Sequence, residues 1–175
     1  MKSTLFVSSV QKELQIERRA VKEYIHGDPL LQKYFDVFLF EDLPAQDRRA
    51  DDLYLDEVDK CGVYLGLFGN EYGWEDSAGL SPTEREFDRA TEKSKYRIIL
   101  VKGTDDGARR LKMKSLIAKA AGQLVRRRFT DVPSLRTELY ASLVAYLAQK
   151  ANCEHCRSTQ PAGAVLRWMI SQRKS

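Results

Sequence analysis

Short apolar runs alternate with amphipathic segments along most of the chain. The first run, residues 4–7, is rich in β-branched and aromatic side chains and stops at Ser8 and Ser9. Residues 10–25 then repeat apolar side chains at broadly helical spacing. This pattern predicts a strand, a turn formed by the two serines, and a helix.

The same alternation continues along the chain. Buried-type apolar runs predict the later strands, and amphipathic runs predict the later helices. The strands are expected at residues 36–42, 63–69, 96–101 and 123–129, and the helices at 53–61, from residue 81 onward, within 103–121 and within 130–150. The last helix carries an apolar stripe formed by Leu135, Leu139, Leu143 and Leu147.

Five successive β-α units predict an α/β fold with a single doubly wound, five-stranded parallel sheet and right-handed crossovers. We expect the flavodoxin-like strand order 2-1-3-4-5. Residues 1–150 are expected to form this domain. Residues 151–175 are expected to form a C-terminal tail or linker, because small and polar residues become frequent there.

The composition is that of an ordinary globular protein, and it limits the partners. The 175 residues are 43% hydrophobic and 31% charged, and the net charge is +4. Residues 41–59 are acid-rich and residues 109–128 are basic, but this asymmetry is too weak to name nucleic acid as a partner. No apolar stretch is long enough to cross a bilayer, and the N-terminus lacks the apolar region of a signal peptide. We therefore expect a cytoplasmic protein with no membrane partner.

Several kinds of site are disfavoured by what the sequence lacks. No G-x-G-x-x-G follows the first strand and no G-x-x-x-x-G-K-[ST] occurs, which disfavours dehydrogenases and P-loop enzymes. A Ser-His-Asp hydrolase is implausible, because His26 and His155 are the only histidines. Cys153 and Cys156 enclose His155 as half of a zinc site, but Cys61 and His26 lie far away in sequence. We therefore predict no metal and no cofactor.

Ligands of open α/β sheets bind at the carboxyl ends of the strands where the strand order reverses, here between the first and third strands. The serine turn, the loop that begins at Gly69 and the start of the third helix are expected to meet there. Ser8 and Ser9 either donate hydrogen bonds to a ribose or phosphate or only cap the first helix. Tyr72 and Trp74 either stack on a base or sugar or serve as lid packing or an oligomer contact.

The third helix opens with two carboxylates. Ser81 is a good N-cap residue, and Glu84, three residues later, completes an S-x-x-E capping box. Glu86 has no capping role, and helical spacing places it at the border of the buried stripe, where the helix dipole favours an ionised carboxylate. This placement suits an anionic nucleophile or a group that stabilises a cationic transition state. Alternatively, Glu86 only complements the dipole and pairs with Arg85 or Arg89.

Four segments resemble a bacterial domain family of unassigned function, whose members often stand at the N-terminus of larger regulators or defence proteins. They are residues 5–25, 38–42, 52–73 and 81–103, and the resemblance covers about residues 3–150. That family is similar to a branch of the Toll/interleukin-1 receptor (TIR) and nucleoside 2-deoxyribosyltransferase superfamily, in which a glutamate near the start of the third helix works at an N-glycosidic bond. The superfamily pattern E-x-x-x-A falls on Glu86 to Ala90. TIR domains usually carry a Trp-Cys pair where this chain has Pro82 and Thr83.

The resemblance implies a TIR-like domain that cleaves the N-glycosidic bond of NAD or a nucleoside in signalling or defence. Glu86 is then the catalytic residue, as a nucleophile or as the partner of an oxocarbenium ion. The residues implied in substrate binding are Ser8, Ser9, Asp42, Gly69, Tyr72, Trp74 and Thr83. The implied partners are a nucleotide or nucleoside ligand, together with further copies of the chain or further domains of a larger system.

Two alternatives from other functional classes stay open. The first is a non-catalytic module for homotypic assembly or ligand sensing, in which Tyr72 and Trp74 make contacts between molecules. The second, weaker alternative is a DNA-associated regulatory domain that uses the basic half of the chain. The arginines at residues 126–128 favour a solvated edge strand over a nucleic-acid contact.

Overall fold

The computed structural model describes residues 2–44 and 50–158. The chain divides into two compact units, Met1–Leu139 and Tyr140–Ser175. The sheet and every residue of the candidate site belong to the first unit. The helix α6 (Val132–Ser158) begins in the first unit, where Leu135 and Leu139 are buried as the apolar stripe predicted.

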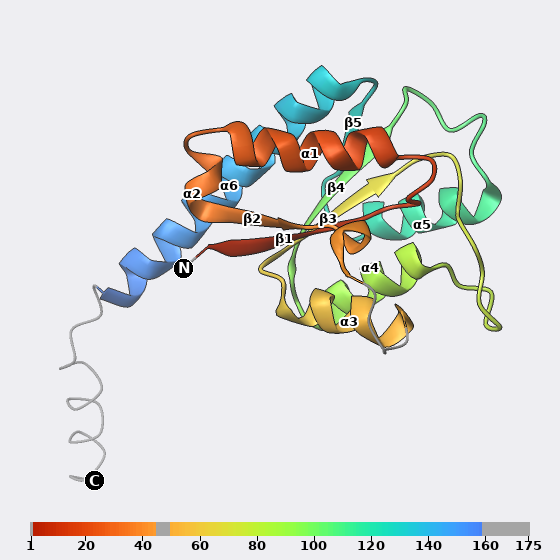
Figure 1. The fold of residues 1–175 in the computed structure, drawn as a ribbon, viewed down its shortest axis with the longest axis horizontal. Helices are drawn as coiled ribbons and strands as arrows, with labels where there is room; N and C mark the ends of the chain where they lie inside the picture. Colours follow the sequence, from red (N-terminus) through yellow and green to blue (C-terminus); the bar gives the residue numbers. More distant parts are fainter. Residues whose placement is uncertain (1, 45–49, 159–175) are drawn as a thin grey trace, which may run out of the picture. The chain divides into compact units, whose positions relative to one another are not determined.

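Five parallel strands form one sheet in the order β2-β1-β3-β4-β5 (Figure 1). They are β1 (Ser3–Ser8), β2 (Phe35–Phe38), β3 (Val63–Phe68), β4 (Tyr96–Lys102) and β5 (Arg127–Phe129). The predicted α/β class and flavodoxin-like strand order are confirmed. The order reverses between β1 and β3, which pair directly, with Ser8 opposite Gly66.

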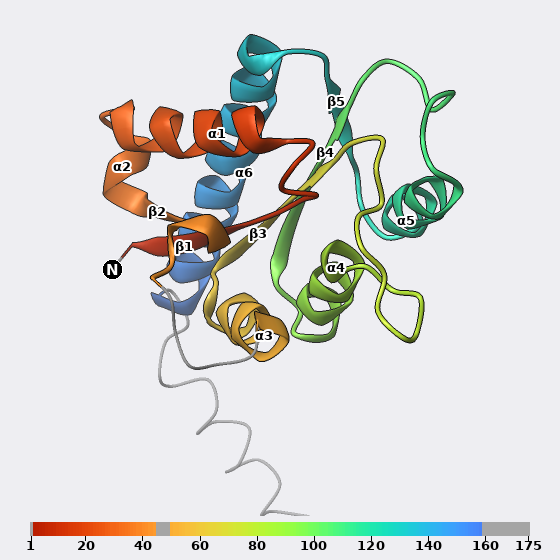
Figure 2. The ribbon, with the colours of Figure 1, turned by 45° about the vertical axis from the view of Figure 1, so that its right-hand side comes forward.

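Helices cover both faces of the sheet (Figure 2). α1 (Gln15–Gly27) lies on one face, and α3 (Ala50–Lys60), α4 (Pro82–Glu92) and α5 (Leu111–Ala121) lie on the other. α2 (Leu31–Tyr34) is a single turn that leads into β2.

An apolar core fills the space between the sheet and the helices α3, α4 and α5. It includes Phe6, Tyr64, Phe68, Ile99 and Val101 from the strands and Val58, Phe87, Ala90, Met113 and Leu116 from the helices. All six residues of β3 are buried, as expected for a central parallel strand. This packing holds the first turn of α4 at the carboxyl ends of β1 and β3.

Three elements differ from the sequence-based expectation. β2 ends at Phe38, and Phe40–Asp42 form a short 3-10 helix. Because β2 is an edge strand and exposes Asp36, the expectation of a longer strand covered on both faces is wrong. α1 begins at Gln15, after a turn in which the Leu14 N–H donates to the Val10 carbonyl at 3.1 Å. β5 has three residues and is shorter than the strand expected at 123–129, but it is an edge strand with Arg127 exposed, in agreement with the predicted solvated edge.

The described residues include only part of the C-terminal segment about which the sequence made predictions. α6 continues to Ser158, whereas residues 159–175 lie outside the described residues. The side chains of Cys153, His155 and Cys156 are also outside them, so the half zinc site and the tail from residue 151 stay predictions. Within residues 2–44 and 50–158, no helix is long and apolar enough to span a membrane. The same residues contain no cluster of His, Cys, Asp and Glu that could hold a metal ion.

Candidate active site

The first turn of α4 is capped through a relay that includes a tyrosine. The Ser81 hydroxyl accepts from the Glu84 N–H at 3.3 Å, and Pro82 occupies the first turn, as predicted. The Glu84 carboxylate does not return directly to Ser81. Instead, the Ser81 N–H donates to the Tyr72 hydroxyl at 3.3 Å, and that hydroxyl donates to Glu84 at 2.5 Å. Lys119 also forms an ion pair with Glu84 at 3.0 Å, so both carboxylate oxygens of Glu84 have structural partners.

The surroundings of Glu86 differ from those of Glu84. Its side chain is buried, with 8% of the residue exposed, and the Ser8 hydroxyl donates a hydrogen bond to its Oε2 atom. Within the described part of the chain, Glu86 has no ion-pair partner and Oε1 receives no hydrogen bond. The alternative of a pair with Arg85 or Arg89 is not observed, because these arginines bind Asp76 and Asp59, respectively.

Burial dominates the electrostatics of Glu86. Removal of the carboxyl from water raises its pKa from 4.5 to about 7, although the Ser8 hydrogen bond and the positive charge of Arg18 act in the opposite direction. At neutral pH the group therefore exchanges readily between its ionised and neutral forms. A carboxyl with this pKa can serve as a nucleophile, a base or an electrostatic partner near physiological pH.

A cavity of about 540 Å³ opens beside Glu86. Its volume is within the range of small-molecule sites, about 300–1,000 Å³. The walls come from the end of β1 and the turn after it, the short 3-10 helix, the helices α1, α3 and α4, and the loop between β3 and α4. The lining residues are Phe6, Val7, Ser9, Val10, Gln11, Lys12, Arg18, Phe40, Tyr54, Tyr72, Gly73, Trp74, Pro82, Thr83 and Glu86.

Four of the predicted substrate-binding residues line this cavity together with Glu86. Thr83 and Tyr72 are buried, whereas Trp74 is 70% exposed at the rim. Ser9 lies in the turn after β1, and its hydroxyl accepts a hydrogen bond from Arg18 at 3.0 Å. The cavity thus brings together residues from three distant segments, as the strand-order argument predicted.

The other three predicted substrate-binding residues are placed differently. Ser8 is not in the cavity wall; it lies behind Glu86 and orients the carboxylate. Asp42 binds Lys22 at 2.6 Å and lines a separate hollow of about 360 Å³. A side chain at Gly69 would collide with the Glu13 carboxylate, which accepts hydrogen bonds from the backbone of the following residues. Gly69 therefore permits close packing and does not line the cavity with Glu86.

Arg18 is a buried cavity residue that the sequence analysis missed. Its guanidinium binds both carboxylate oxygens of Glu41, at 2.8 and 2.6 Å, and donates to the Val7 carbonyl at 2.9 Å. A signal was present in the sequence, since Arg18 falls four residues after Leu14 and three before Val21 on the apolar stripe of α1. Gln11, Lys12 and other lining residues gave no comparable signal.

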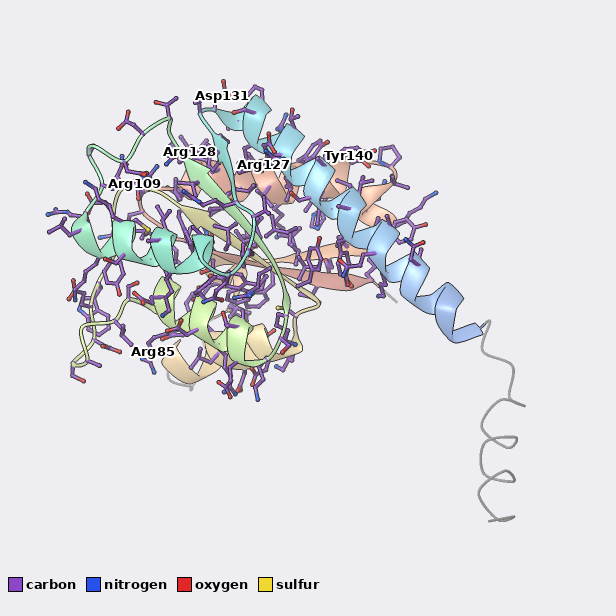
Figure 3. The ribbon with its side chains drawn as sticks, turned by 180° about the vertical axis from the view of Figure 1, so that it is seen from behind. Arg85, Arg109, Arg127, Arg128, Asp131 and Tyr140 are labelled. Carbon is purple, nitrogen blue, oxygen red and sulfur yellow. The ribbon has the colours of Figure 1, made fainter. Side chains whose placement is uncertain are left out.

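Another buried charge, Arg109, lies at the carboxyl ends of β3 and β4 (Figure 3). Its Nε atom donates to Asp106 at 2.6 Å, and its terminal nitrogens donate to the carbonyls of Gly69 and Lys102. Arg128 also binds Asp106, at 2.9 Å. Hydrogen bonds from both arginines lower the pKa of Asp106. Part of the basic half of the chain is therefore used for internal contacts.

Comparisons with known proteins place the chain among uncharacterised domains. Residues 4–144 match the model of a family described as "Domain of unknown function (DUF4062)". No curated protein matches the sequence.

Two solved structures were compared with the fold. The chain is similar to a CMP N-glycosidase from Clostridium botulinum, with a TM-score of 0.51 and 10% sequence identity over 79% of this chain and 98% of that one. A 2-desoxiribosyltransferase from Leishmania mexicana gives a TM-score of 0.43 and 10% identity over 58% of this chain and 66% of that one. At this identity, the first likeness establishes a shared fold. The TIR-like affiliation stays a prediction.

Proposed function

The chain belongs to the DUF4062 family, and we propose that it cleaves the N-glycosidic bond of a nucleoside or nucleotide, with Glu86 acting at the sugar. One observation carries the proposal: a buried carboxylate with a single hydrogen-bond donor lies in the wall of a nucleoside-sized cavity. That cavity is at the strand-order reversal, where α/β sheets bind ligands.

The chemistry follows from the two oxygens of Glu86. Cleavage breaks the bond between the anomeric carbon and the base nitrogen, whose electron pair leaves with the base, and the sugar passes through an oxocarbenium-like state. Ser8 holds Oε2, which leaves Oε1 to face the anomeric carbon. Oε1 then either bonds to that carbon, giving a glycosyl-enzyme that water hydrolyses, or stabilises its positive charge while water attacks.

The remaining cavity residues have matching roles in this proposal. Ser9 accepts a hydrogen bond from Arg18, so its own proton is free to be donated to a sugar hydroxyl or a phosphate. Thr83 supplies a second buried hydroxyl beside Glu86. Tyr72 and Trp74 offer aromatic surface to a base, and Trp74 is exposed enough to close over it.

The similarity to a CMP N-glycosidase suggests which substrate to test first. The Clostridium botulinum protein is, by its name, an N-glycosidase of CMP. A pyrimidine nucleotide is therefore the first compound to offer this chain, followed by deoxynucleosides and NAD. A role in signalling or defence, and assembly into oligomers, stay predictions beyond this chemistry.

The test is release of free base. Wild-type protein and Glu86→Gln are incubated with CMP, each deoxynucleoside and NAD, and the products are separated by chromatography. We expect wild type to release base from at least one compound and Glu86→Gln to release none above background. If wild type releases no base from any of them, the enzymatic proposal is wrong and the assembly module becomes the better account.

A further inference from the structure

The Tyr64 hydroxyl is a buried polar group without an evident structural use. Tyr64 is fully buried in β3, and within the described residues its hydroxyl has no hydrogen-bond partner. The ring packs against Phe6 and Phe87, each with a centroid distance of 6.3 Å. Phenylalanine would fill this apolar space equally well, because burying an unpaired hydroxyl is unfavourable. The hydroxyl therefore calls for a function that packing does not provide.

The strand register places the Tyr64 side chain on the same face of the sheet as Ser8. Tyr64 pairs with Phe6 across β1 and β3, and Ser8 follows two residues later on the same face of β1. Ser8 is itself only 1% exposed. Burial raises the pKa of Tyr64 well above its usual value, the charge of Glu86 adds to the increase, and the Ser8 hydroxyl opposes it. Both groups thus lie close enough to act on the phenol.

The hydrogen-bonding capacity of Ser8 completes the arrangement. A serine hydroxyl has one proton and two lone pairs. Its proton is donated to Glu86, so its oxygen remains available to accept from a neighbour. Tyr64 is a buried donor in need of an acceptor, and Ser8 is a hydroxyl that acts on it.

We propose that Tyr64 is a positioning residue for Glu86, and that its hydroxyl donates to Ser8 while Ser8 donates to the carboxylate. The relay favours the ionised form of Glu86, because each hydrogen bond polarises the next. The consequence for turnover rests on the proposed function, whereas the relay itself does not. Tyr64 never touches the substrate and acts through Ser8 alone.

Other charged and titratable groups also face these residues and must be kept constant in a test. Arg18 lowers the pKa of Glu86, and Lys12, Tyr54 and Tyr72 line the same cavity. Around the Tyr64 phenol, the additional groups are Cys61, Asp88 and Arg97.

A double-mutant cycle on the pKa of Glu86 tests the relay without any substrate. The carboxyl carbon of Glu86 is titrated by NMR in wild type, Tyr64→Phe, Ser8→Ala and the double variant. Tyr64→Phe should raise the pKa by about half a unit to one unit, the shift expected when one hydrogen bond is lost. In the Ser8→Ala background, the same change should have almost no further effect, because its only route to Glu86 is gone. Tyr34→Phe, which removes an exposed hydroxyl on α2, is the control.

The relay is refuted if Tyr64→Phe leaves the Glu86 pKa unchanged, or if the two substitutions shift it additively. Where base release is detected, Tyr64→Phe should reduce kcat/KM roughly twofold to tenfold near neutral pH. Activity should return to the wild-type level at about pH 9, where every Glu86 is ionised. A purely structural role would lower activity at both pH values. If neither wild type nor any variant releases base, but the pKa of Glu86 shifts in the non-additive way predicted here, the proposed function is wrong and the relay is retained.

Discussion

Two parts of the carboxyl edge of the sheet each bury a charged side chain, but the two side chains differ in how many hydrogen-bond partners they have. Between β3 and β4, Arg109 donates to a carboxylate and to three backbone carbonyls, so its buried charge is compensated. Between β1 and β3, Glu86 has one hydroxyl donor and a cavity. Their exposed fractions, 4% and 8%, are nearly the same.

The difference indicates what each charge is for. A buried charge with most of its hydrogen bonds made anchors the segments that it joins, here the start of the loop after β3 and the segment after β4. A buried carboxylate left short of partners costs stability, and such cost is typical of sites that await a substrate. The same contrast separates Glu86 from Glu84, which is two residues away and fully partnered.

The largest expected effect separates these two glutamates. Glu86→Gln should reduce kcat/KM for base release by about three orders of magnitude or more, as loss of a charge in the transition state does. Glu84→Gln removes only a partner of Tyr72 and Lys119 and should keep activity within about tenfold, since a cap contributes about 1 kcal/mol. Equal losses in the two variants would show that the helix start, and not the cavity carboxylate, sustains activity.

The second effect concerns the buried charge of Arg109. Arg109→Met should lower the free energy of unfolding by about 3–5 kcal/mol, because three backbone carbonyls lose a donor and Asp106 keeps only Arg128 as its partner. Urea denaturation provides the measurement. The control is Arg110→Met, whose side chain is 71% exposed in its pair with Glu71. That change should cost less than about 1 kcal/mol. A similar cost for both substitutions would mean that Arg109 is not an anchor.

The third effect is a gain in stability that depends on pH. Between pH 4.5 and about 7, folded Glu86 holds a proton that the unfolded chain has released, so its contribution to stability falls as the pH rises through this window. Glu86→Gln removes the ionisable group. At about pH 8, the free energy of unfolding of the variant should exceed that of wild type by up to about 3 kcal/mol. The difference should shrink towards about pH 5, and a constant difference would contradict the raised pKa.

The smallest effect is expected at the cavity rim. Trp74→Ala should raise KM by about twofold to tenfold through the loss of one aromatic contact, with kcat nearly unchanged. Because Trp74 is 70% exposed, the free energy of unfolding should stay within about 0.5 kcal/mol of wild type. A change in oligomeric state instead of KM would favour the assembly alternative, in which this tryptophan contacts another molecule.

Local patterns made most of the fold and Glu86 predictable. Apolar runs such as β3 and β4 are visible in the sequence because every residue of a central strand is buried or nearly so. Glu86 could be distinguished from Glu84 because helical spacing and capping are properties of a single segment. Its role as a site residue stays a prediction until activity is measured.

Tertiary contacts made the rest unpredictable. Glu41 and Asp42 read as the end of an apolar strand, but Glu41 turns towards Arg18, 23 residues earlier in the chain, while Asp42 turns towards Lys22. The partner of Glu86, Ser8, is separated from it by 78 residues. Pairings of this kind are set by how the elements pack, and no local spacing in the sequence encodes them.

The pH dependence of kcat/KM for base release tests the central claim most directly, because it reports the ionisation of the free enzyme's working group. If the buried, sparsely partnered carboxylate of Glu86 performs the chemistry, activity should rise with pH through a midpoint near 7. A midpoint near the ordinary value of 4.5, or no acid limb at all, would contradict the account.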